Sequence, residues 1–319
     1  MVKTSNSFDF AIVGGGIVGL SCAYKLQVEY PQLKIVVFEK EQSLAAHQTG
    51  RNSGVIHSGL YYRPGSFRAK NCVNGRKQLV EFAKKYNIKH DVCGKVVVAV
   101  SQDEVERLDK ICQTGKANGL EGIEKIDANR LKEIEPYVEG LAALWVPESG
   151  IIDFVGVTNK LAELIKEINP SSQILYSCEV KSFSSGGLIN TSKGQFQASK
   201  KILCGGLHSD RLAKKDKVSS DVRIVGFRGD YYDLSEQGKS KVNNLIYPVP
   251  NPEFPFLGVH FTRMVDGSIE CGPNAVFTFK REGYGKTDFN LKDTIEALMY
   301  QGTWKLFFKH WRFGLNEYK

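Results

Sequence analysis

Three glycines near the N-terminus have the spacing that a protein needs to hold a dinucleotide. Gly14, Gly16 and Gly19 follow an apolar segment at residues 8–13, and a second apolar segment ends at Glu39. The first glycine permits a tight turn, the second lets the backbone approach a pyrophosphate, and the third lets a helix pack close to the sheet. Glu39 can accept hydrogen bonds from adenosine ribose hydroxyls, and its charge disfavours a 2′-phosphate there. The alternative is a glycine-rich turn without a ligand.

A strand–helix–strand unit is needed to position these glycines. Residues 17–30 have a helical pattern that ends before Pro31. The N-terminus of that helix offers N–H groups and a positive dipole end to phosphates. Later segments at 174–183 and 201–204 are typical of strands that join the same sheet, and Gly186-Gly187 indicates a hairpin.

The second half of the chain has a different pattern. A mixed insertion at about 87–150 precedes the later strands of the first sheet, and from residue 222 onward the pattern is β-rich. Asp266-Gly267 is a tight-turn signal. The sequence therefore predicts a second, β-rich domain with strands at 222–234, 245–247, 256–262 and 268–271.

Composition and charge are those of an ordinary globular protein. The 319 residues carry a net charge of +8, which could favour anionic substrates or an anionic membrane surface, and no nucleic-acid module is recognisable. A lysine-rich, solvated surface explains most of these charges. The seven cysteines form no C-x-x-C pair, so neither a disulfide framework nor a metal site is indicated. No run of about 18 apolar residues predicts a transmembrane helix. A reducing, cytoplasmic location fits these features best.

The segment from 291 to about 312 is expected to form one helix in which aromatic and basic residues alternate. Such a helix suits the surface of a bilayer, and the protein would then be peripheral on the inner face of the cytoplasmic membrane. The alternative is a helix packed on the protein's own core, with its lysines reaching to solvent.

Several long stretches carry a family resemblance. One is the loop Gln48-Thr-Gly-Arg-Asn-Ser-Gly-Val-Ile-His-Ser-Gly-Leu-Tyr-Tyr62, and the longest covers residues 246–284. With the segments at 150–154, 204–210, 227–231 and 304–312, they resemble the FAD-dependent L-2-hydroxyglutarate dehydrogenase/oxidase family, within the D-amino-acid-oxidase-like superfamily.

The resemblance implies a flavoenzyme that oxidises L-2-hydroxyglutarate to 2-oxoglutarate by hydride transfer to flavin N5 of FAD, with a quinone or oxygen as electron acceptor. Members of the family normally continue with a glycine-containing segment that closes over the flavin, whereas this sequence stops at Lys319. A truncated, non-catalytic FAD-binding fragment is therefore one alternative. An amino-acid or amine oxidase of the same superfamily is another.

The expected architecture is α/β, with a Rossmann-like FAD-binding domain and an α+β, β-rich substrate domain of the D-amino-acid-oxidase type. The expected ranges are 1–86 and 151–215 for the FAD-binding domain, 87–150 and 216–290 for the substrate domain, and 291–319 for the C-terminal aromatic and basic helix.

The resemblance adds cofactor-binding residues to the four derived from the glycine motif. Gly205 and Gly206 would let the chain pass close to the dinucleotide, and the alternative for them is a strand-to-helix turn. Val180 would offer backbone groups to the adenine, with an ordinary sheet residue as its alternative. The remaining additions are Lys40, Thr49, Ser53 and Gly54.

A proton acceptor and two carboxylate-binding groups are needed for this reaction. His260, in an apolar strand, is the preferred base, because a neutral imidazole with a pKa near 6.5 accepts protons near pH 7. His57 is the second candidate, and a structural histidine is the alternative. Arg51 and Arg228 are preferred for the carboxylates over Arg263 and Arg281, with structural ion pairs as the alternative. Tyr61 and Tyr62 could donate hydroxyl hydrogen bonds or pack.

Overall fold

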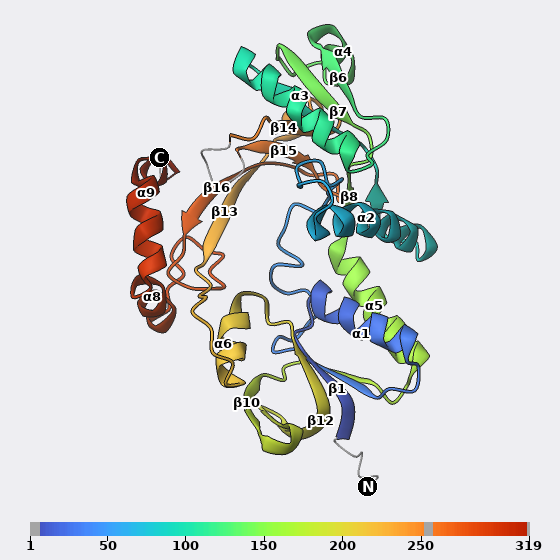
Figure 1. The fold of residues 1–319 in the computed structure, drawn as a ribbon, viewed down its shortest axis with the longest axis vertical. Coiled ribbons are helices and arrows are strands. Elements are labelled where there is room, and N and C mark those ends of the chain that lie inside the picture. Colours follow the sequence, from blue (N-terminus) through green and yellow to red (C-terminus); the bar gives the residue numbers. More distant parts are fainter. Residues whose placement is uncertain (1–6, 252–257, 318–319) are drawn as a thin grey trace. The chain divides into compact units, whose positions relative to one another are not determined.

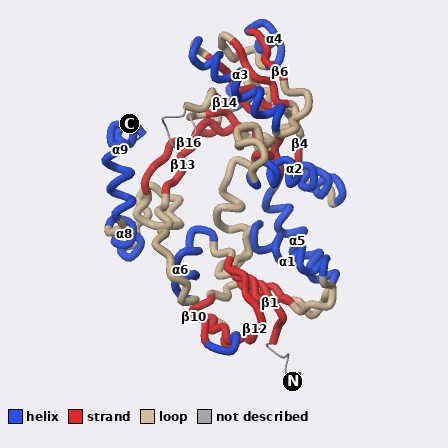
Figure 2. Tube along the Cα trace, viewed as in Figure 1, coloured by secondary structure: helices blue, strands red, loops and turns tan. Residues whose placement is uncertain are grey.

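The computed structural model describes residues 7–251 and 258–317. Within them the chain forms two compact units. Of the described residues, unit 1 comprises 7–52, 154–227 and 277–315, and unit 2 comprises 53–153, 228–251, 258–276 and 316–317. Figures 1 and 2 show the elements of each unit.

Unit 1 is built on a six-stranded sheet with the order β10-β11-β12-β1-β2-β9. Four neighbouring strands are parallel, and β10 and β11 extend the sheet as an antiparallel hairpin. The expectation that later strands join the N-terminal pair is therefore confirmed. The bounds are β1 (Ser7–Val13), β2 (Ile35–Phe38), β9 (Gln173–Leu175), β10 (Val180–Ser184), β11 (Leu188–Thr191) and β12 (Gly194–Leu203).

Helices cover both faces of this sheet, as expected for a parallel sheet. On one face α1 (Ile17–Glu29) packs beside α5 (Phe154–Ile168), and Figure 1 shows the two helices side by side. On the other face lies α6 (Ser209–Lys215), whose Leu212 joins the core formed by Phe8, Val36 and Phe38. The end of β1, where the glycine motif begins, therefore lies between two layers of helices.

Unit 2 contains a seven-stranded sheet with the order β13-β16-β15-β14-β5-β7-β6 and a small sheet with the order β3-β8-β4. One core lies between the large sheet and α3 (Gln102–Ala117), and a second contains Leu131 of α4 (Ala128–Ile134). The other bounds are β3 (Val55–Ile56), β4 (His90–Asp91), β5 (Lys95–Ala99), β6 (Glu124–Asp127), β7 (Ala142–Val146), β8 (Gly150–Ile152), β13 (Phe227–Asp233), β14 (Leu245–Pro248), β15 (His260–Arg263), β16 (Ile269–Phe277), α2 (Phe67–Lys85) and α7 (Glu236–Lys239).

Two predicted strands differ from the structure. The strand expected at 174–183 is interrupted between β9 and β10, because Ser177 and Cys178 donate backbone hydrogen bonds to Glu41 O and Glu39 O, at 2.7 Å each. The strand expected at 222–234 begins only at Phe227, since the backbone before it takes other partners, such as the Asp210 carboxylate for Ile224 N. Residues 256 and 257 of the strand expected at 256–262 lie outside the described residues, and the strand observed there, β15, begins only at His260.

The prediction of a single helix from 291 to about 312 is wrong. The structure has α8 (Leu291–Leu298) and α9 (Gln301–Glu317), the latter kinked at His310. The break is stabilised by side chains that cap the end of α8: Thr303 Oγ1 donates to Ala297 O at 2.7 Å, and Trp304 Nε1 donates to Leu298 O at 2.6 Å. No helix in the described part of the chain is long and apolar enough to cross a membrane.

Candidate functional site

The turn between β1 and α1 depends on two glycines. Gly14 has φ +117°, and a Cβ there would lie 2.2 Å from Cys204 O. A Cβ on Gly19 would lie 2.0 Å from Gly14 O, so the first turn of α1 packs directly against the turn that precedes it. Side chains of any other type are excluded at both positions, because real Cβ atoms do not approach carbonyl oxygens so closely.

Gly16 differs from these two glycines. Its backbone is extended, with φ −81° and ψ 176°, and the one neighbour that a Cβ would meet is Thr49 Oγ1, at 3.0 Å. The same Thr49 Oγ1 accepts a hydrogen bond from Ile17 N at 3.0 Å, which ties the loop after β2 to the first turn of α1. Gly16 therefore leaves the N-terminus of α1 accessible rather than permitting a turn.

Glu39 lies at the end of β2 and faces the same turn. Its Oε2 accepts a hydrogen bond from Gly15 N at 2.7 Å, and its Oε1 accepts one from Glu41 N at 2.8 Å. The residue is 8% exposed. Each carboxylate oxygen has a second lone pair. The two backbone contacts therefore fix the carboxylate and leave it able to accept two further hydrogen bonds.

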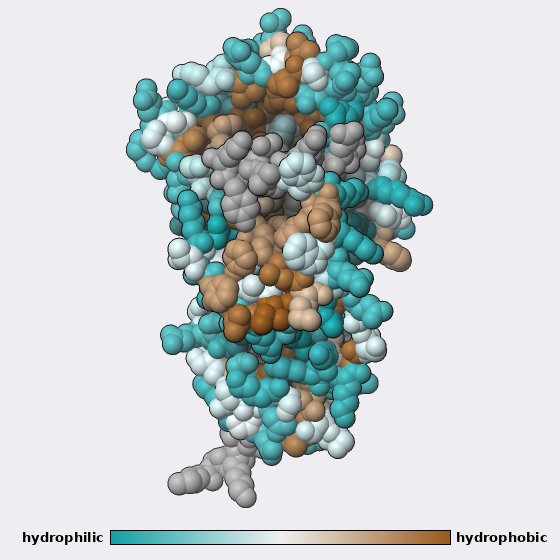
Figure 3. Space-filling model, turned by 90° about the vertical axis from the view of Figure 1, so that its left-hand side faces the viewer, coloured by the Kyte–Doolittle hydropathy of each residue, from teal (hydrophilic) through white to brown (hydrophobic). Residues whose placement is uncertain are grey.

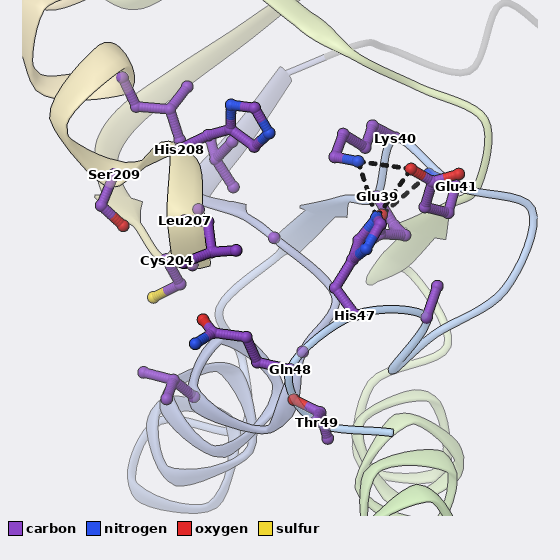
Figure 4. A pocket seen from close by; sticks show the side chains of 18 of the residues that line it. Glu39, Lys40, Glu41, His47, Gln48, Thr49, Cys204, Leu207, His208 and Ser209 are labelled. Carbon is purple, nitrogen blue, oxygen red and sulfur yellow. Dashed lines mark hydrogen bonds and ion pairs between the residues drawn. The ribbon is translucent and has the colours of Figure 1, made fainter. Parts of the chain in front are cut away.

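These elements surround a cavity of about 990 Å³ in unit 1, which Figure 4 shows from close by. The end of β2 contributes Glu39 and Lys40, the following loop contributes Gln48 and Thr49, and the opposite wall is formed by residues 204–209. Of the predicted cofactor residues, those that line the cavity are Gly14, Gly16, Glu39, Lys40, Thr49, Val180, Gly205 and Gly206. Gly19 lies beneath this surface, against Gly14.

Lys40 lies in the middle of a charged cluster on the cavity wall. Its Nζ is 2.8 Å from Glu282 Oε2 and 2.9 Å from His47 Nε2, and it also contacts Glu41. Burial opposes ionisation of Glu282, yet hydrogen bonds from His208 and Lys40 lower its pKa to about 2. Glu41, His47 and Glu282 are close enough to hold a metal ion, but the Lys40 ammonium already supplies the positive charge there.

The remaining predicted cofactor residues have local roles. Val180 O accepts a hydrogen bond from Lys215 Nζ at 2.9 Å. Gly205 is the N-cap of the short 3-10 helix η2 (Gly206–His208), and a Cβ on Gly205 would lie 2.3 Å from Leu212 Cδ1. Ser53 and Gly54 begin unit 2 and are not among the residues lining the cavity.

Both candidate bases lie in unit 2. His260 is 6% exposed and stacks on Tyr247, with ring centroids 4.1 Å apart. Its Nδ1 lies 3.0 Å from Gly258 O, and burial together with the nearby Lys95 charge lowers its pKa below 6.5. The His57 side chain is partly exposed. Desolvation of the His57 ring by the surrounding protein, and the charges of Lys95 and His260, lower the pKa of His57 as well. The imidazoles of His57 and His260 are therefore neutral at pH 7.

The candidate arginines are engaged in different ways. Arg51, in unit 1, stacks over the Tyr284 ring at 4.1 Å. Arg228, on β13, contacts both carboxylate oxygens of Asp230. Arg263 pairs with Asp91 at 3.4 Å, and Arg281 forms a buried ion pair with Asp210.

Some polar residues at these positions gave no recognisable signal in the sequence. Lys95 is 1% exposed, at the start of β5, among valines that predicted only a strand. Glu282 contacts Lys40 from 242 positions away along the chain. Tyr247 would have been found only by pairing β14 with β15, which places it opposite His260.

The cavity fits the adenosine and pyrophosphate end of a dinucleotide. A fixed carboxylate, a glycine without a side chain at the start of α1 and the N-terminal turn of that helix all face it. Those are the groups that bind ribose hydroxyls and phosphates in βαβ dinucleotide sites.

Comparisons with known proteins agree with this geometry. Residues 9–303 match the family described as FAD dependent oxidoreductase. L-2-hydroxyglutarate dehydrogenase of Indibacter alkaliphilus is 46% identical over 97% of this chain and 78% of its own length, and the human mitochondrial enzyme of that name is 43% identical over 98% and 71%. The FAD-bound L-α-glycerophosphate oxidase of Mycoplasma pneumoniae superposes with a TM-score of 0.78 at 29% identity, over 94% of this chain and 78% of that one.

The matched range includes the glycine turn, Glu39, the loop that carries His57 and the strand that carries His260. The predicted fold class, a dinucleotide-binding α/β unit with a β-rich second unit of the D-amino-acid-oxidase type, is confirmed. The chain belongs to the FAD-dependent oxidoreductases and, among them, to the L-2-hydroxyglutarate dehydrogenase family.

Proposed function

We propose that this protein oxidises L-2-hydroxyglutarate to 2-oxoglutarate with FAD as its cofactor. The observation that carries the proposal is the 46% identity to an L-2-hydroxyglutarate dehydrogenase over nearly the whole chain. The cavity beside Gly16 and Glu39 supports it, because its groups suit the ADP portion of FAD. FAD, when bound, accepts the hydride that leaves C2 of the substrate.

The residues of unit 1 would bind and orient the cofactor. Glu39 would accept hydrogen bonds from the adenosine ribose, and the first turn of α1 would face the pyrophosphate, with Thr49 holding the adjoining loop in place. The Lys40 and Glu282 pair would hold the cavity wall at the end of β2.

His260 would accept the hydroxyl proton of the substrate. Because Nδ1 faces the Gly258 carbonyl, it carries the hydrogen, and Nε2 keeps a lone pair for proton transfer. Stacking on Tyr247 fixes the plane of the ring. His57 is the second candidate, and its more exposed side chain suits an orienting role equally well.

The candidate arginines are proposed as carboxylate-binding groups. Arg51 donates Nε to Ala46 O at 3.4 Å and lies with its face on Tyr284, so its terminal N–H groups would bind the carboxylate. Arg228 would have to share its guanidinium between Asp230 and the substrate.

The first experiment is the visible spectrum of the purified protein before and after anaerobic addition of L-2-hydroxyglutarate. Flavin bands that bleach with this substrate, and not with amino acids, are the expected result. Persistent flavin bands would contradict the assigned substrate, and bleaching by amino acids would favour an amine or amino-acid oxidase. A protein without any flavin bands would contradict FAD dependence.

Electrons are proposed to leave the flavin at a membrane, with a quinone or oxygen as acceptor. Large hydrophobic side chains are exposed on α8 and α9, and Figure 3 shows hydrophobic residues gathered on the side of the molecule that carries these helices. This hydrophobic patch, on α8, α9 and the turn between them, consists of Leu291, Ile295, Met299, Trp304, Phe308 and Trp311. Exposed lysines accompany it, at 292, 305 and 309, as on interfacial helices.

Phe308→Glu is expected to weaken sedimentation with vesicles containing anionic lipid roughly tenfold, because it removes a large apolar contact and adds repulsion. Phe308 is 75% exposed, so the fold is unaffected. Phe67→Glu, at an 84% exposed position on α2, is the matched control. Equal sedimentation of both variants and the wild type would exclude the hydrophobic patch as the membrane contact.

A further inference from the structure

Lys95 occupies an unusual position for a lysine. It begins β5, an inner strand of the large sheet in unit 2 that pairs with β14 and β7, and is 1% exposed. Its Nζ lies 4.9 Å from the ring centroid of Tyr61 and 4.9 Å from that of Tyr247. An ammonium group between two aromatic faces is held by cation–π attraction, which leaves its N–H donors free to bind an acceptor.

The charge of Lys95 is not balanced by an acid. Within residues 7–251 and 258–317 it forms no ion pair with a carboxylate, and the one acidic neighbour acting on it is the Cys72 thiol, whose own pKa is raised by burial. Burial lowers the pKa of Lys95 to about 8, so most of the group is still protonated at pH 7. A buried charge without a partner is costly to stability.

Other cations in unit 2 differ from Lys95 in this respect. Arg76 pairs with Glu148, Arg228 with Asp230, and Arg263 with Asp91. Each of those cations therefore has a counter-ion within the fold. Among the residues that the structure describes, no carboxylate pairs with Lys95, which leaves its charge for a ligand to balance.

The sheet places Lys95 on the same face as the candidate base. Tyr247 lies opposite Val97 on β5, two residues from Lys95, and the β14–β15 register places His260 opposite Tyr247. Alternation along the strands puts all three side chains on one face. The Tyr247 ring therefore lies against both the Lys95 cation and the His260 imidazole. Oxidation of a 2-hydroxy acid uses such a pair, because the cation binds the carboxylate and the proton acceptor takes the proton of the neighbouring hydroxyl group.

We propose that Lys95 binds a carboxylate of the substrate and thereby places the hydroxyl group of the 2-hydroxy acid at His260. This inference rests on the proposed function for the identity of the substrate. The anion site itself rests on the buried, unbalanced cation and on its two aromatic neighbours.

The test compares Lys95→Met with the wild-type holoenzyme. Glutarate and 2-oxoglutarate are titrated separately into the oxidised enzyme, and binding is followed by the change in the flavin spectrum. The variant is expected to bind both roughly 10- to 100-fold more weakly, because it lacks a hydrogen bond to a charged group. KM for L-2-hydroxyglutarate should rise by a similar factor. Unchanged dissociation constants and KM in Lys95→Met would overturn the proposal.

Thermal unfolding supplies a readout that does not depend on turnover. Without ligand, Lys95→Met should unfold at a higher temperature than the wild type, because it removes a buried charge that has no partner. Glutarate should raise the unfolding temperature of the wild type and leave that of the variant unchanged. If neither Lys95→Met nor Lys95→Gln folds, Lys95 is required for the fold, and the proposal is refuted.

Lys125→Met is the matched control, since Lys125 lies on β6 of the same sheet but is paired with Asp109 at the surface, at 2.8 Å. It should bind glutarate like the wild type. Failure of the proposed function is separable from failure of this inference. If L-2-hydroxyglutarate does not bleach the flavin of the wild type, but Lys95→Met still abolishes glutarate binding, the proposed anion site stands. Only the assigned substrate is then contradicted.

Discussion

Gly16→Val is expected to lose FAD while the fold is kept. The backbone of Gly16 is extended, which valine favours, so the change introduces no backbone strain. Its side chain would project beside Thr49 Oγ1 and into the cavity at the N-terminus of α1. That is the position where a pyrophosphate must approach the backbone, and overlap there should weaken FAD binding roughly a hundredfold or more.

The measurement is a titration of the apoprotein with FAD, together with a thermal unfolding curve. Gly75→Val is the matched control, because a Cβ on Gly75 of α2 would meet nothing within 4 Å. Gly16→Ala should give an intermediate loss, since its single methyl group meets Thr49 at 3.0 Å. If Gly16→Val bound FAD as tightly as the wild type, the pyrophosphate would not lie at this turn.

The glycine turn was predictable because its chemistry is local. The positive φ of Gly14 and the approach of Gly19 to Gly14 O both lie within the turn, and the sequence spacing specifies them, although Gly14 also lies against Cys204 O from a distant segment. The pairing of Arg228 with Asp230 is also local, since residues two apart on a strand share a face. That rule, applied to the sequence, would have indicated that Arg228 already has a carboxylate partner.

The arrangement around Lys95 was not predictable in the same way. Its neighbours come from β14 and from the loop after β3, and the register between strands decides which side chains meet. In the sequence, the lysine before three valines is indistinguishable from a residue at an exposed strand end. The pairing of Lys40 with Glu282 is likewise set by tertiary packing.

The division of the C-terminal segment into α8 and α9 lies between these cases. Aromatic and basic residues continue through the break, so the pattern predicted one helix. The break is stabilised by Thr303 and Trp304, whose side chains cap carbonyls of α8. Capping at a helix C-terminus by side chains of the following helix has no simple spacing rule, which is why the sequence pattern missed it.

His260→Ala is expected to slow flavin reduction by L-2-hydroxyglutarate roughly a hundredfold or more, without loss of FAD. The cavity assigned to FAD is lined by residues of unit 1, whereas His260 belongs to unit 2, so cofactor retention should not depend on the imidazole. The measurement is anaerobic stopped-flow reduction of the flavin at saturating substrate. His90→Ala is the matched control, because its Nδ1 also contacts a carbonyl two residues earlier, Ile88 O at 2.8 Å.

The pH dependence of the wild type separates a base from a packing residue. His260 must be neutral to accept a proton, and burial with the nearby Lys95 charge lowers its pKa below 6.5. The rate of flavin reduction should therefore hold as the pH falls past 6.5 and decline only at lower pH, where the imidazole becomes protonated. Lys95→Met should move this decline toward higher pH, because it removes the charge that disfavours the imidazolium. If His260→Ala reduced its flavin at the wild-type rate and still showed the decline at low pH, another group would be the base. His57 would then be tested next.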